Sequence, residues 1–379
     1  MTKNIFDSVF AQMPIQHGLL RQNTGRIQTL WMESGPSCNL GCGYCFAGSG
    51  VAEPYPEQLM VWNHFQAIIA EAASLGVDSI GIPGAGEPFH PRNRVMTMRI
   101  LRECAQHGIF VTLFTTGEYL PELVAEIKLL PVELMLKCNS FNAKKQNDFV
   151  GRPARSGFGT RRNMALKMLM RQGFNDPNDP IALRHGRESR LALVTSIMHE
   201  EAPGGLSNVR DMPGILRFCR RNNVIFDCDS VLERGRGATC TLRMKGEATK
   251  AVLIDLQKID REEFGRAWPL SQSYVGTVCD RFHHHLYITK YGDVHPCIGS
   301  VQVSLGNVRT DGTLAKAWER KEMRVIRSRN YAGACASCAR FQRRECNSCL
   351  GRWSEDLTND SLIQHGCVKT RKCWNYEET

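Results

Sequence analysis

The sequence contains no run of about 18 apolar residues, which is roughly the length a helix needs to cross a bilayer. Its first residues, Met1–Gln12, lack the basic segment followed by an apolar segment that is typical of a secretory signal. Basic and aromatic residues are not interleaved in the spaced pattern of an RNA-binding sheet. These absences predict a cytoplasmic protein that has no membrane partner and does not require nucleic acid.

The 379 residues otherwise have a globular composition, with 42% apolar and 23% charged residues. A chain of this length has room for two domains, or for one large barrel with an appendage. Its unusual feature is a total of 16 cysteines. Because the cytosol keeps thiols reduced, this number of cysteines indicates bound metal rather than disulfides. The formal charge of +10 is compatible with a moderately anionic substrate.

From Ile27 onward, short apolar runs alternate with longer segments whose apolar residues recur at helical spacing. The expected strands are Ile27–Glu33, Ser79–Pro83, Phe110–Thr115, Val132–Lys137, Leu191–Met198 and Val224–Cys228. The expected helices are Pro56–Leu75, Arg94–His107, Leu123–Leu129, Thr160–Gln172 and Val209–Asn222. This alternation predicts parallel βαβ units in an α/β fold. We expect a partial (β/α)6 barrel similar to a TIM barrel, with chemistry at the carboxyl ends of its strands.

Composition changes along the chain predict its domain organisation. We expect an N-terminal extension at 1–26, the barrel at 27–232 and a small, loop-rich, cysteine-rich domain at 233–379. Asn175–Ser189 is expected to be an insertion loop, and Glu233–Gly237 the exit from the barrel. Beyond that exit only Leu314–Ile326 has a convincing helical pattern, and eight cysteines fall between Cys279 and Cys373. A segment with so few apolar runs needs metal to fold.

Three cysteines follow the first expected strand in a C-x3-C-x2-C pattern, at Cys38, Cys42 and Cys45. Their thiolates can turn toward one point, but three ligands are too few for a closed tetrahedral zinc site. An iron–sulfur cluster with one iron left open fits them better. The alternative is a loop of free or zinc-binding cysteines.

This spacing resembles that of the radical S-adenosylmethionine (SAM) superfamily. The resemblance implies a [4Fe–4S] cluster on the three cysteines, with SAM bound at its open iron. It also implies that an electron from a flavodoxin- or ferredoxin-type donor cleaves SAM to a 5′-deoxyadenosyl radical, which abstracts a hydrogen atom from substrate.

Short motifs at the expected strand ends extend this resemblance. Gly84, Ala85, Gly86 and Glu87 resemble the family's Gly-Gly-Glu-Pro turn, which holds the amino group of SAM, and Thr116 lies in a turn that resembles Thr-Asn-Gly. The resemblance places further SAM contacts at Tyr44, Lys137, Asn139, Ser140, Thr195 and Ser196. The alternative is that these polar residues cap helices.

On the sixth expected strand, Asp227, Cys228 and Asp229 occupy adjacent positions, so the thiol and the two carboxylates face opposite ways. One of these faces should look into the barrel. A carboxylate there can take a substrate proton and a thiol can donate a hydrogen atom, so all three are candidate catalytic residues. A buried structural cysteine is the favoured alternative for Cys228.

The C-terminal region resembles the SPASM extension, which binds auxiliary [4Fe–4S] clusters in many radical SAM enzymes. Cys279, Gly292, Cys297, Leu305–Val308 and Trp318 match its first half. The resemblance implies one or two auxiliary clusters. One takes Cys335, Cys338, Cys346 and Cys367, with Cys373 able to substitute for Cys367. The other takes Cys279, Cys297 and Cys349, and its fourth ligand is left open between Cys373, a side chain near Asp280–His285 and the substrate. Two gaps depart from the family pattern. Seven residues separate Cys338 from Cys346 where the family usually has five, and two separate Cys346 from Cys349 where the family has three. A zinc ribbon is the alternative.

His283, His284 and His285 are expected at the surface or beside metal ligands, because adjacent histidines on a strand cannot all bind one ion.

The predicted function is that of a radical SAM oxidoreductase acting on a small polar metabolite, such as an aminosugar or nucleoside-like natural product. This preference rests on residues 1–26, which are too few for the leader-binding domain that peptide-modifying relatives commonly carry. One alternative is a maturase that modifies side chains of a ribosomal peptide or protein. The other is a non-enzymatic, zinc-stapled binding protein.

Overall fold

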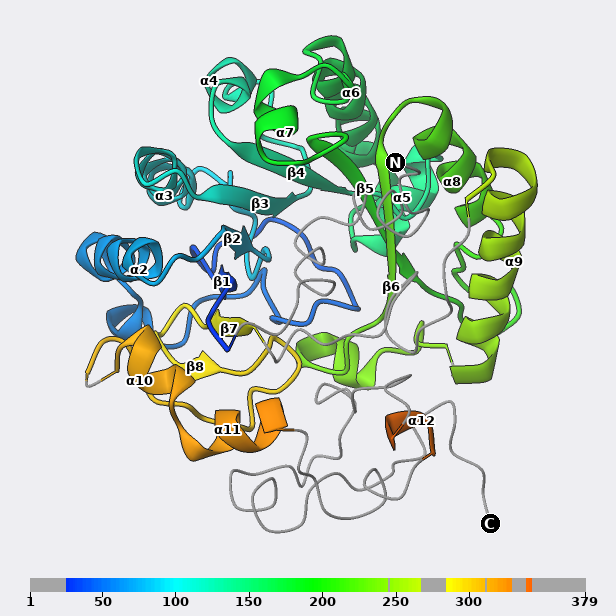
Figure 1. The fold of residues 1–379 in the computed structure, drawn as a ribbon. Coiled ribbons are helices and arrows are strands. Elements are labelled where there is room, and N and C mark those ends of the chain that lie inside the picture. Colours follow the sequence, from blue (N-terminus) through cyan, green and yellow to red (C-terminus); the bar gives the residue numbers. More distant parts are fainter. Residues whose placement is uncertain (1–24, 245, 267–283, 311, 329–338, 343–379) are drawn as a thin grey trace.

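The computed structural model describes residues 25–244, 246–266, 284–310, 312–328 and 339–342. One eight-stranded sheet, in the order β6-β5-β4-β3-β2-β1-β7-β8, forms its centre. Figure 1 shows the strands following an open arc, with helices along the outer side. No helix in the described part of the chain is long and apolar enough to cross a membrane.

The strands are β1 Thr29–Met32, β2 Ser79–Ile82, β3 Phe110–Thr115, β4 Val132–Lys137, β5 Leu191–Ile197, β6 Ile225–Ser230, β7 His285–Ile288 and β8 Val294–His295. The helices are α2 Trp62–Ser74, α3 Arg94–Gln106, α4 Val124–Lys128, α5 Ala143–Phe149, α6 Phe158–Arg171, α7 Pro180–Arg184, α8 Met212–Arg221, α9 Gly246–Phe264, α10 Leu314–Trp318, α11 Lys321–Ser328 and α12 Ala339–Gln342. Short 3₁₀ turns include η3 Ala154–Ser156 and η4 Gly235–Thr239.

The first six strands confirm the predicted α/β order, because each pairs in parallel with the next one along the chain. The sequence of β4 is almost continuously apolar because both faces of this strand are covered by other parts of the protein. Leu134 and Leu136 pack in the main core, while Met135 faces the opposite side with Ala192 and Val194 of β5. Parallel pairing brings the carboxyl ends of all six strands to one edge, where residues distant in sequence meet.

The sheet ends at β6 on one side but continues beyond β1 on the other. Strand β7 pairs in parallel with β1, and β8 folds back antiparallel against β7. The C-terminal segment therefore adds two strands to the sheet, across the predicted boundary between residues 232 and 233. His284 and His285 are buried at the start of this addition, which excludes a surface position for both, while a position beside metal ligands stays a prediction. His283 lies outside the described residues.

Two further differences concern helices. Helix α9 was missed because its sequence is rich in charge, although Val252, Leu253 and Leu256 are buried on one side. The single helix expected over Leu314–Ile326 is two helices, α10 and α11, and the Thr313 side chain accepts a hydrogen bond from Lys316 N at the start of the first.

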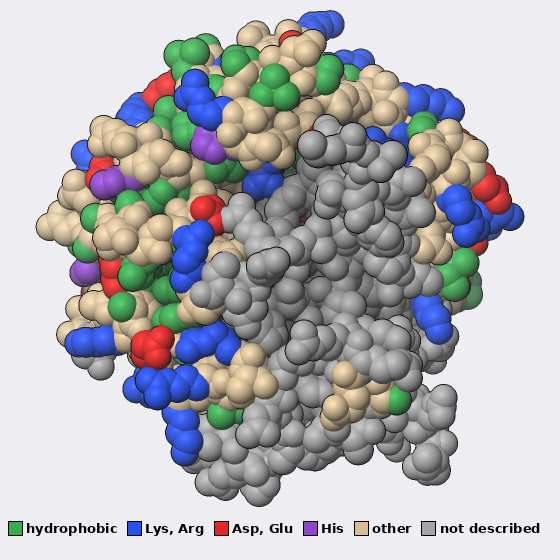
Figure 2. Space-filling model, in the orientation of Figure 1, with side chains coloured by type: hydrophobic (Ala, Val, Ile, Leu, Met, Phe, Trp, Pro, Cys, Tyr) green, Lys and Arg blue, Asp and Glu red, His purple; other side chains and the backbone are tan. Residues whose placement is uncertain are grey.

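Lysine and arginine side chains gather over α10 and α11 on the face shown in Figure 2. Lys316, Arg320, Lys321 and Arg324 are all exposed there. The described part of this face therefore presents positive charge at the end of the molecule that carries these two helices.

The segment expected as an insertion loop contains α7 and has a structural role. Asp179 accepts hydrogen bonds from two backbone amides at the start of α7 and pairs with Lys128 and the fully buried Arg190. Arg190 also donates to the carbonyl oxygens of Lys128, Leu130 and Val132, at 3.0–3.2 Å. Burial by itself raises the pKa of Asp179, but the hydrogen bonds from Lys128 and Arg190 lower it to about 2. This carboxylate therefore contributes stability above about pH 4, which is lost as the pH falls toward 2.

Replacing Arg190 with methionine should lower the free energy of unfolding by about 3–5 kcal/mol, because it leaves a buried carboxylate and three carbonyl oxygens short of donors. Denaturant-induced unfolding at neutral pH measures the loss. Arg102→Met, which breaks an exposed pair with Glu126, is the matched control and should change stability far less. Equal losses in the two variants would contradict the structural role of Arg190.

Candidate active site

A cavity of about 240 Å³ lies at the carboxyl ends of the parallel strands. Among the predicted site residues, it is lined by Cys38, Cys42, Cys45, Tyr44, Gly84, Gly86, Glu87, Thr116, Lys137, Ser196, Asp227 and Asp229. Much of the remaining wall is apolar, from Trp31, Phe114, Met135, Val194 and Ile298. Sequence reasoning missed these apolar residues, because strand residues facing the barrel look like any other core residues in the pattern.

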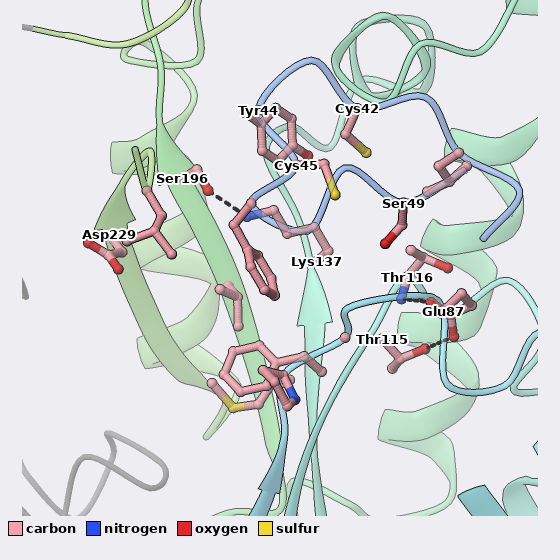
Figure 3. Close-up of a pocket in the computed structure, with 18 of the residues that line it drawn as sticks. Cys42, Tyr44, Cys45, Ser49, Glu87, Thr115, Thr116, Lys137, Ser196 and Asp229 are labelled. Atoms are coloured by element: carbon pink, nitrogen blue, oxygen red, sulfur yellow. Dashed lines mark hydrogen bonds between the residues drawn. The ribbon is translucent and has the colours of Figure 1, made fainter. Parts of the chain in front are cut away.

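The cysteine loop contributes three thiols to the cavity, and Figure 3 shows the sulfurs of Cys42 and Cys45 pointing into the same space. Burial raises the pKa of Cys38 to about 12 and that of Cys42 to about 11. Without metal these groups are neutral thiols at pH 7. Iron binding must therefore displace their protons, as it does for any thiolate ligand.

Arg236 holds this loop in shape from a segment almost 200 residues downstream. Its guanidinium donates to the carbonyl oxygens of Cys42 at 2.8 Å, Gly48 at 3.0 Å and Ser49 at 2.6 Å. Its backbone amide donates to Cys45 O at 2.9 Å. The preceding Gly235 has a φ of +56°, and a Cβ there would lie 2.4 Å from Phe46 O. The segment Glu233–Gly237, expected only as the exit from the barrel, thus also fixes the conformation of the cysteine loop through hydrogen bonds.

Glu87 ties the end of β2 to the end of β3. Its carboxylate accepts from Thr115 Oγ1 at 2.6 Å and from the Thr116 amide at 2.8 Å, as Figure 3 shows. Burial raises the pKa of Glu87, and these hydrogen bonds oppose that rise. The carboxylate lines the cavity with its position already set by two backbone segments.

The glycines beside Glu87 serve the packing of the protein itself. Gly84 has a φ of +73°, which favours glycine. A Cβ on Gly86 would lie 2.4 Å from Gly35 O and 2.7 Å from Ser37 O, so this turn packs directly against the backbone that leads into the cysteine loop. Ala85 does not line the cavity; it is buried, and its carbonyl accepts from Ser49 Oγ.

Lys137, at the end of β4, donates to Ser196 Oγ at 2.6 Å and lies 5.2 Å from the centre of the Tyr44 ring. Burial lowers the pKa of Lys137 to about 8, although Cys42, Asp229 and Asp227 act in the opposite direction. A cation that loses its proton near physiological pH therefore lies between the cysteine loop and β6.

Three residues that were predicted to contact SAM lie behind the residues that line the cavity and hydrogen-bond to neighbouring residues. Asn139 donates to Tyr44 Oη at 2.7 Å and accepts from the Ser196 amide at 3.2 Å. Ser140 donates to Asp211 Oδ1 at 2.8 Å, and Thr195 donates to Cys138 O at 2.7 Å. Asn139, Ser140 and Thr195 thus position neighbours and do not line the cavity.

On β6 the structure settles which face looks inward. Asp227 and Asp229 line the cavity, whereas Cys228 is fully buried in the main core on the other face. Cys228 is therefore a structural cysteine, the alternative favoured from sequence, and the expectation that it is a catalytic candidate was wrong.

Cys297 is the predicted auxiliary ligand that lies within the described residues. It follows β8, is buried, and its Sγ lies 3.4 Å from Ser300 Oγ. Cys279, Cys335, Cys338, Cys346, Cys349, Cys367 and Cys373 lie outside the described residues.

The donor set fits the expected groups. Three cysteine thiols of one loop line a cavity that also contains a preset carboxylate acceptor, Glu87, and a cation, Lys137. The thiols suit an iron–sulfur cluster with one open iron. The acceptor and the cation are complementary to the ammonium and carboxylate groups of an amino acid such as the methionyl part of SAM.

Two family models match the chain. Residues 32–179 match the radical SAM superfamily, and residues 279–339 match SPASM, an iron–sulfur cluster-binding domain. The chain belongs to the radical SAM superfamily. Radical SAM proteins are enzymes, and the two domains imply a [4Fe–4S] cluster, SAM and auxiliary iron–sulfur clusters.

This radical SAM chain is also similar to a curated protein, the mycofactocin maturase MftC of Mycolicibacterium smegmatis. The two are 24% identical over 310 residues, which cover 80% of this chain and 74% of the relative.

Solved structures share the fold. SuiB of Streptococcus suis bound to SAM has a TM-score of 0.62 at 17% identity, covering 90% of this chain and 78% of SuiB. SuiB bound to its precursor peptide SuiA has a TM-score of 0.59 at 17% identity, covering 90% and 76%. The protein anSMEcpe with bound SAM has a TM-score of 0.54 at 15% identity, covering 87% and 92%.

Gly86→Ala should lower the free energy of unfolding by about 1–3 kcal/mol, because the added Cβ collides with backbone that cannot rotate away. Denaturant unfolding of the metal-free protein measures this change. Gly43→Ala, in the same site but with nothing within 4 Å of its Cβ, is the control. A Gly86 variant as stable as the Gly43 variant would contradict the tight packing of the turn on the loop.

Proposed function

We propose that this protein is a radical SAM/SPASM maturase that modifies a peptide. The observation that carries the proposal is its similarity to a maturase over 80% of the chain, and the separate matches to the radical SAM and SPASM models agree with it. The fold shared with SuiB, which binds a precursor peptide, supports the same substrate class. The comparisons thus favour the peptide alternative over the small polar metabolite predicted from sequence.

In this proposal, Cys38, Cys42 and Cys45 hold the [4Fe–4S] cluster. Glu87 and the turn at Thr116 receive the amino group of SAM, and Lys137 receives its carboxylate. The bound cofactors supply a carbon-centred radical that removes a hydrogen atom from substrate. The apolar wall formed by Trp31, Phe114, Met135 and Val194 keeps water away from that radical.

The carboxylates of β6 are the proposed substrate-facing groups. Asp227 and Asp229 both line the cavity, where either can accept a proton as the substrate is oxidised. Figure 3 shows Asp229 across the cavity from the cysteine loop. The proposed reaction is a net oxidation of the peptide. One hydrogen atom would leave the peptide as part of 5′-deoxyadenosine, a proton would go to Asp227 or Asp229, and the remaining electron would pass to an auxiliary cluster. A flavodoxin- or ferredoxin-type donor would supply the electron for SAM cleavage. A cytoplasmic location suits this chemistry, since it keeps the cysteines reduced.

The domain limits also remain part of the proposal. Residues 1–26 form the extension, 27–232 the barrel and 233–379 the auxiliary cluster domain, with β7 and β8 of that domain completing the sheet.

A direct test uses the anaerobically reconstituted enzyme with SAM, a reductant and candidate precursor peptides, taken from any short reading frames found beside its gene. We expect 5′-deoxyadenosine together with a mass change in the peptide. Cys42→Ala should abolish both products, because two thiols cannot hold the cluster. A Cys42→Ala protein that still cleaves SAM would overturn the cluster assignment. Formation of 5′-deoxyadenosine with aminosugars and not with the peptide would overturn the peptide assignment alone.

The role of Lys137 predicts a pH dependence of SAM binding. Lys137 is cationic below its pKa of about 8 and neutral above it, so its attraction for the SAM carboxylate is present at pH 7 and is lost as the pH rises through 8 and beyond. Equilibrium dialysis between pH 7 and pH 9.5 should show weakening affinity. Lys137→Met should bind SAM about tenfold or more weakly at pH 7, as expected for the loss of one charge-assisted hydrogen bond, and should lose most of the pH dependence. An unchanged pH profile in the variant would exclude Lys137 as the carboxylate partner.

A further inference from the structure

Arg236 is a cation that lies against the cysteine loop from outside the cavity. Its guanidinium donates to three carbonyl oxygens, those of Cys42, Gly48 and Ser49, and all three belong to this loop. Arg236 does not line the cavity, whereas Lys137 does. Its charge is therefore held outside the space that the proposed function assigns to SAM and substrate.

The backbone around Arg236 approaches the loop closely because a glycine stands on each side of it. A Cβ on Gly235 would lie 2.8 Å from Cys45 O, and a Cβ on Gly237 would lie 3.3 Å from Tyr44 O. The hydrogen bond from the guanidinium to the Cys42 carbonyl is 2.8 Å long. The side chain is thus fixed on the backbone of one predicted cluster ligand, and its own backbone lies beside a second.

The positive charge of Arg236 has no carboxylate partner in the part of the chain that the structure describes, and its side-chain acceptors are neutral carbonyl groups. Two other arginines held within the fold differ in this respect, since Arg190 pairs with Asp179 and Arg220 pairs with Asp260. A guanidinium cannot lose its proton in a protein. A partly buried cation without a counter-charge is stabilised when an anionic group forms beside it.

We propose that Arg236 is the counter-charge of the cluster on Cys38, Cys42 and Cys45, and that it raises the reduction potential of this cluster. The inference rests on the proposed function, which assigns the cluster to three described cysteines that line one cavity. Iron binding replaces the thiol protons, so the loaded loop carries negative charge. Reduction adds one electron from the donor without making or breaking a bond, and a fixed cation favours the more negative, reduced form. Arg236 is a positioning residue, since it acts through the loop and does not line the cavity.

The test is a redox titration of the full chain, reconstituted without oxygen and kept free of SAM, followed by electron paramagnetic resonance. The signal that Cys42→Ala removes identifies the cluster of the loop. In Arg236→Gln, the ratio of reduced to oxidised cluster at a fixed potential should fall about tenfold, a shift of about 59 mV to more negative potential for one electron.

Two controls separate the charge of Arg236 from its hydrogen bonds. Arg236→Lys keeps the cation but loses the planar fork that reaches three carbonyl groups. It should retain most of the parent potential, although it should release iron to a chelator faster than the parent does. Arg243→Gln removes an exposed arginine seven residues downstream, whose ion pair is with Glu233, and should change neither quantity.

An unchanged potential in Arg236→Gln would overturn the inference, and so would a lysine variant that shifts as far as the glutamine variant. If the glutamine variant binds no cluster, a lysine variant that loads at the parent potential supports the counter-charge. A lysine variant that also fails to load, or loads at a lower potential, overturns it.

The test also separates this inference from the proposed function. Signals that all survive Cys42→Ala would overturn the cluster assignment and this inference together, whereas a failure confined to the Arg236 variants would leave that assignment intact. Because the titration contains neither SAM nor substrate, an error in the peptide assignment would leave its result unaffected.

Discussion

The site depends on how one irregular loop is held. Residues 38–49 have no helix or strand to set the direction of their thiols, so hydrogen bonds from remote segments must do it. Arg236 provides three donors to carbonyl oxygens of this loop, and the Gly41 amide donates to Val150 O at 3.0 Å. Loop backbone is stable at the end of a sheet only when such groups are paired. The cysteines can form a preset ligand group because the loop is tied to the whole barrel.

The parallel arrangement of the strands explains why residues from different parts of the chain meet at the cavity. Each βα unit returns its next strand in the same direction, so β2, β3, β4 and β6 deliver Glu87, Thr116, Lys137 and Asp229 to one edge. The acceptor and the cation come from different units, yet their positions depend on the same sheet register. The addition of β7 beside β1 extends this arrangement, since it brings the segment of Cys297 next to the strand that leads into the cysteine loop.

Local pattern accounts for the part of the fold that could be predicted. The six parallel strands, the cavity at their carboxyl ends and most of its polar lining follow from apolar runs and from motif residues placed just after them. Alternation on β6 showed that Asp227 and Asp229 share a face, but it could not show which face looks inward, because both faces of a barrel strand are buried.

Contacts between segments distant in sequence could not be predicted. Arg236 was expected only as part of the exit from the barrel, and nothing near it in the sequence indicates three carbonyl partners almost 200 residues away. Gly86 was expected in the turn that holds the amino group of SAM, and nothing in the sequence indicated that its missing side chain makes room for the backbone of Gly35 and Ser37. Strand β7 has only four residues, too short a run to be assigned to a sheet built mainly from chain more than 50 residues upstream.

The most direct measurement is the content of iron, sulfide and zinc per chain in protein reconstituted without oxygen. Clusters on the three-cysteine loop and on the SPASM domain predict about twelve irons for three [4Fe–4S] clusters, or about eight for two, with matching sulfide. Protein that contains zinc and no iron would contradict the account at its centre, because the loop held by Arg236 would then be a zinc site.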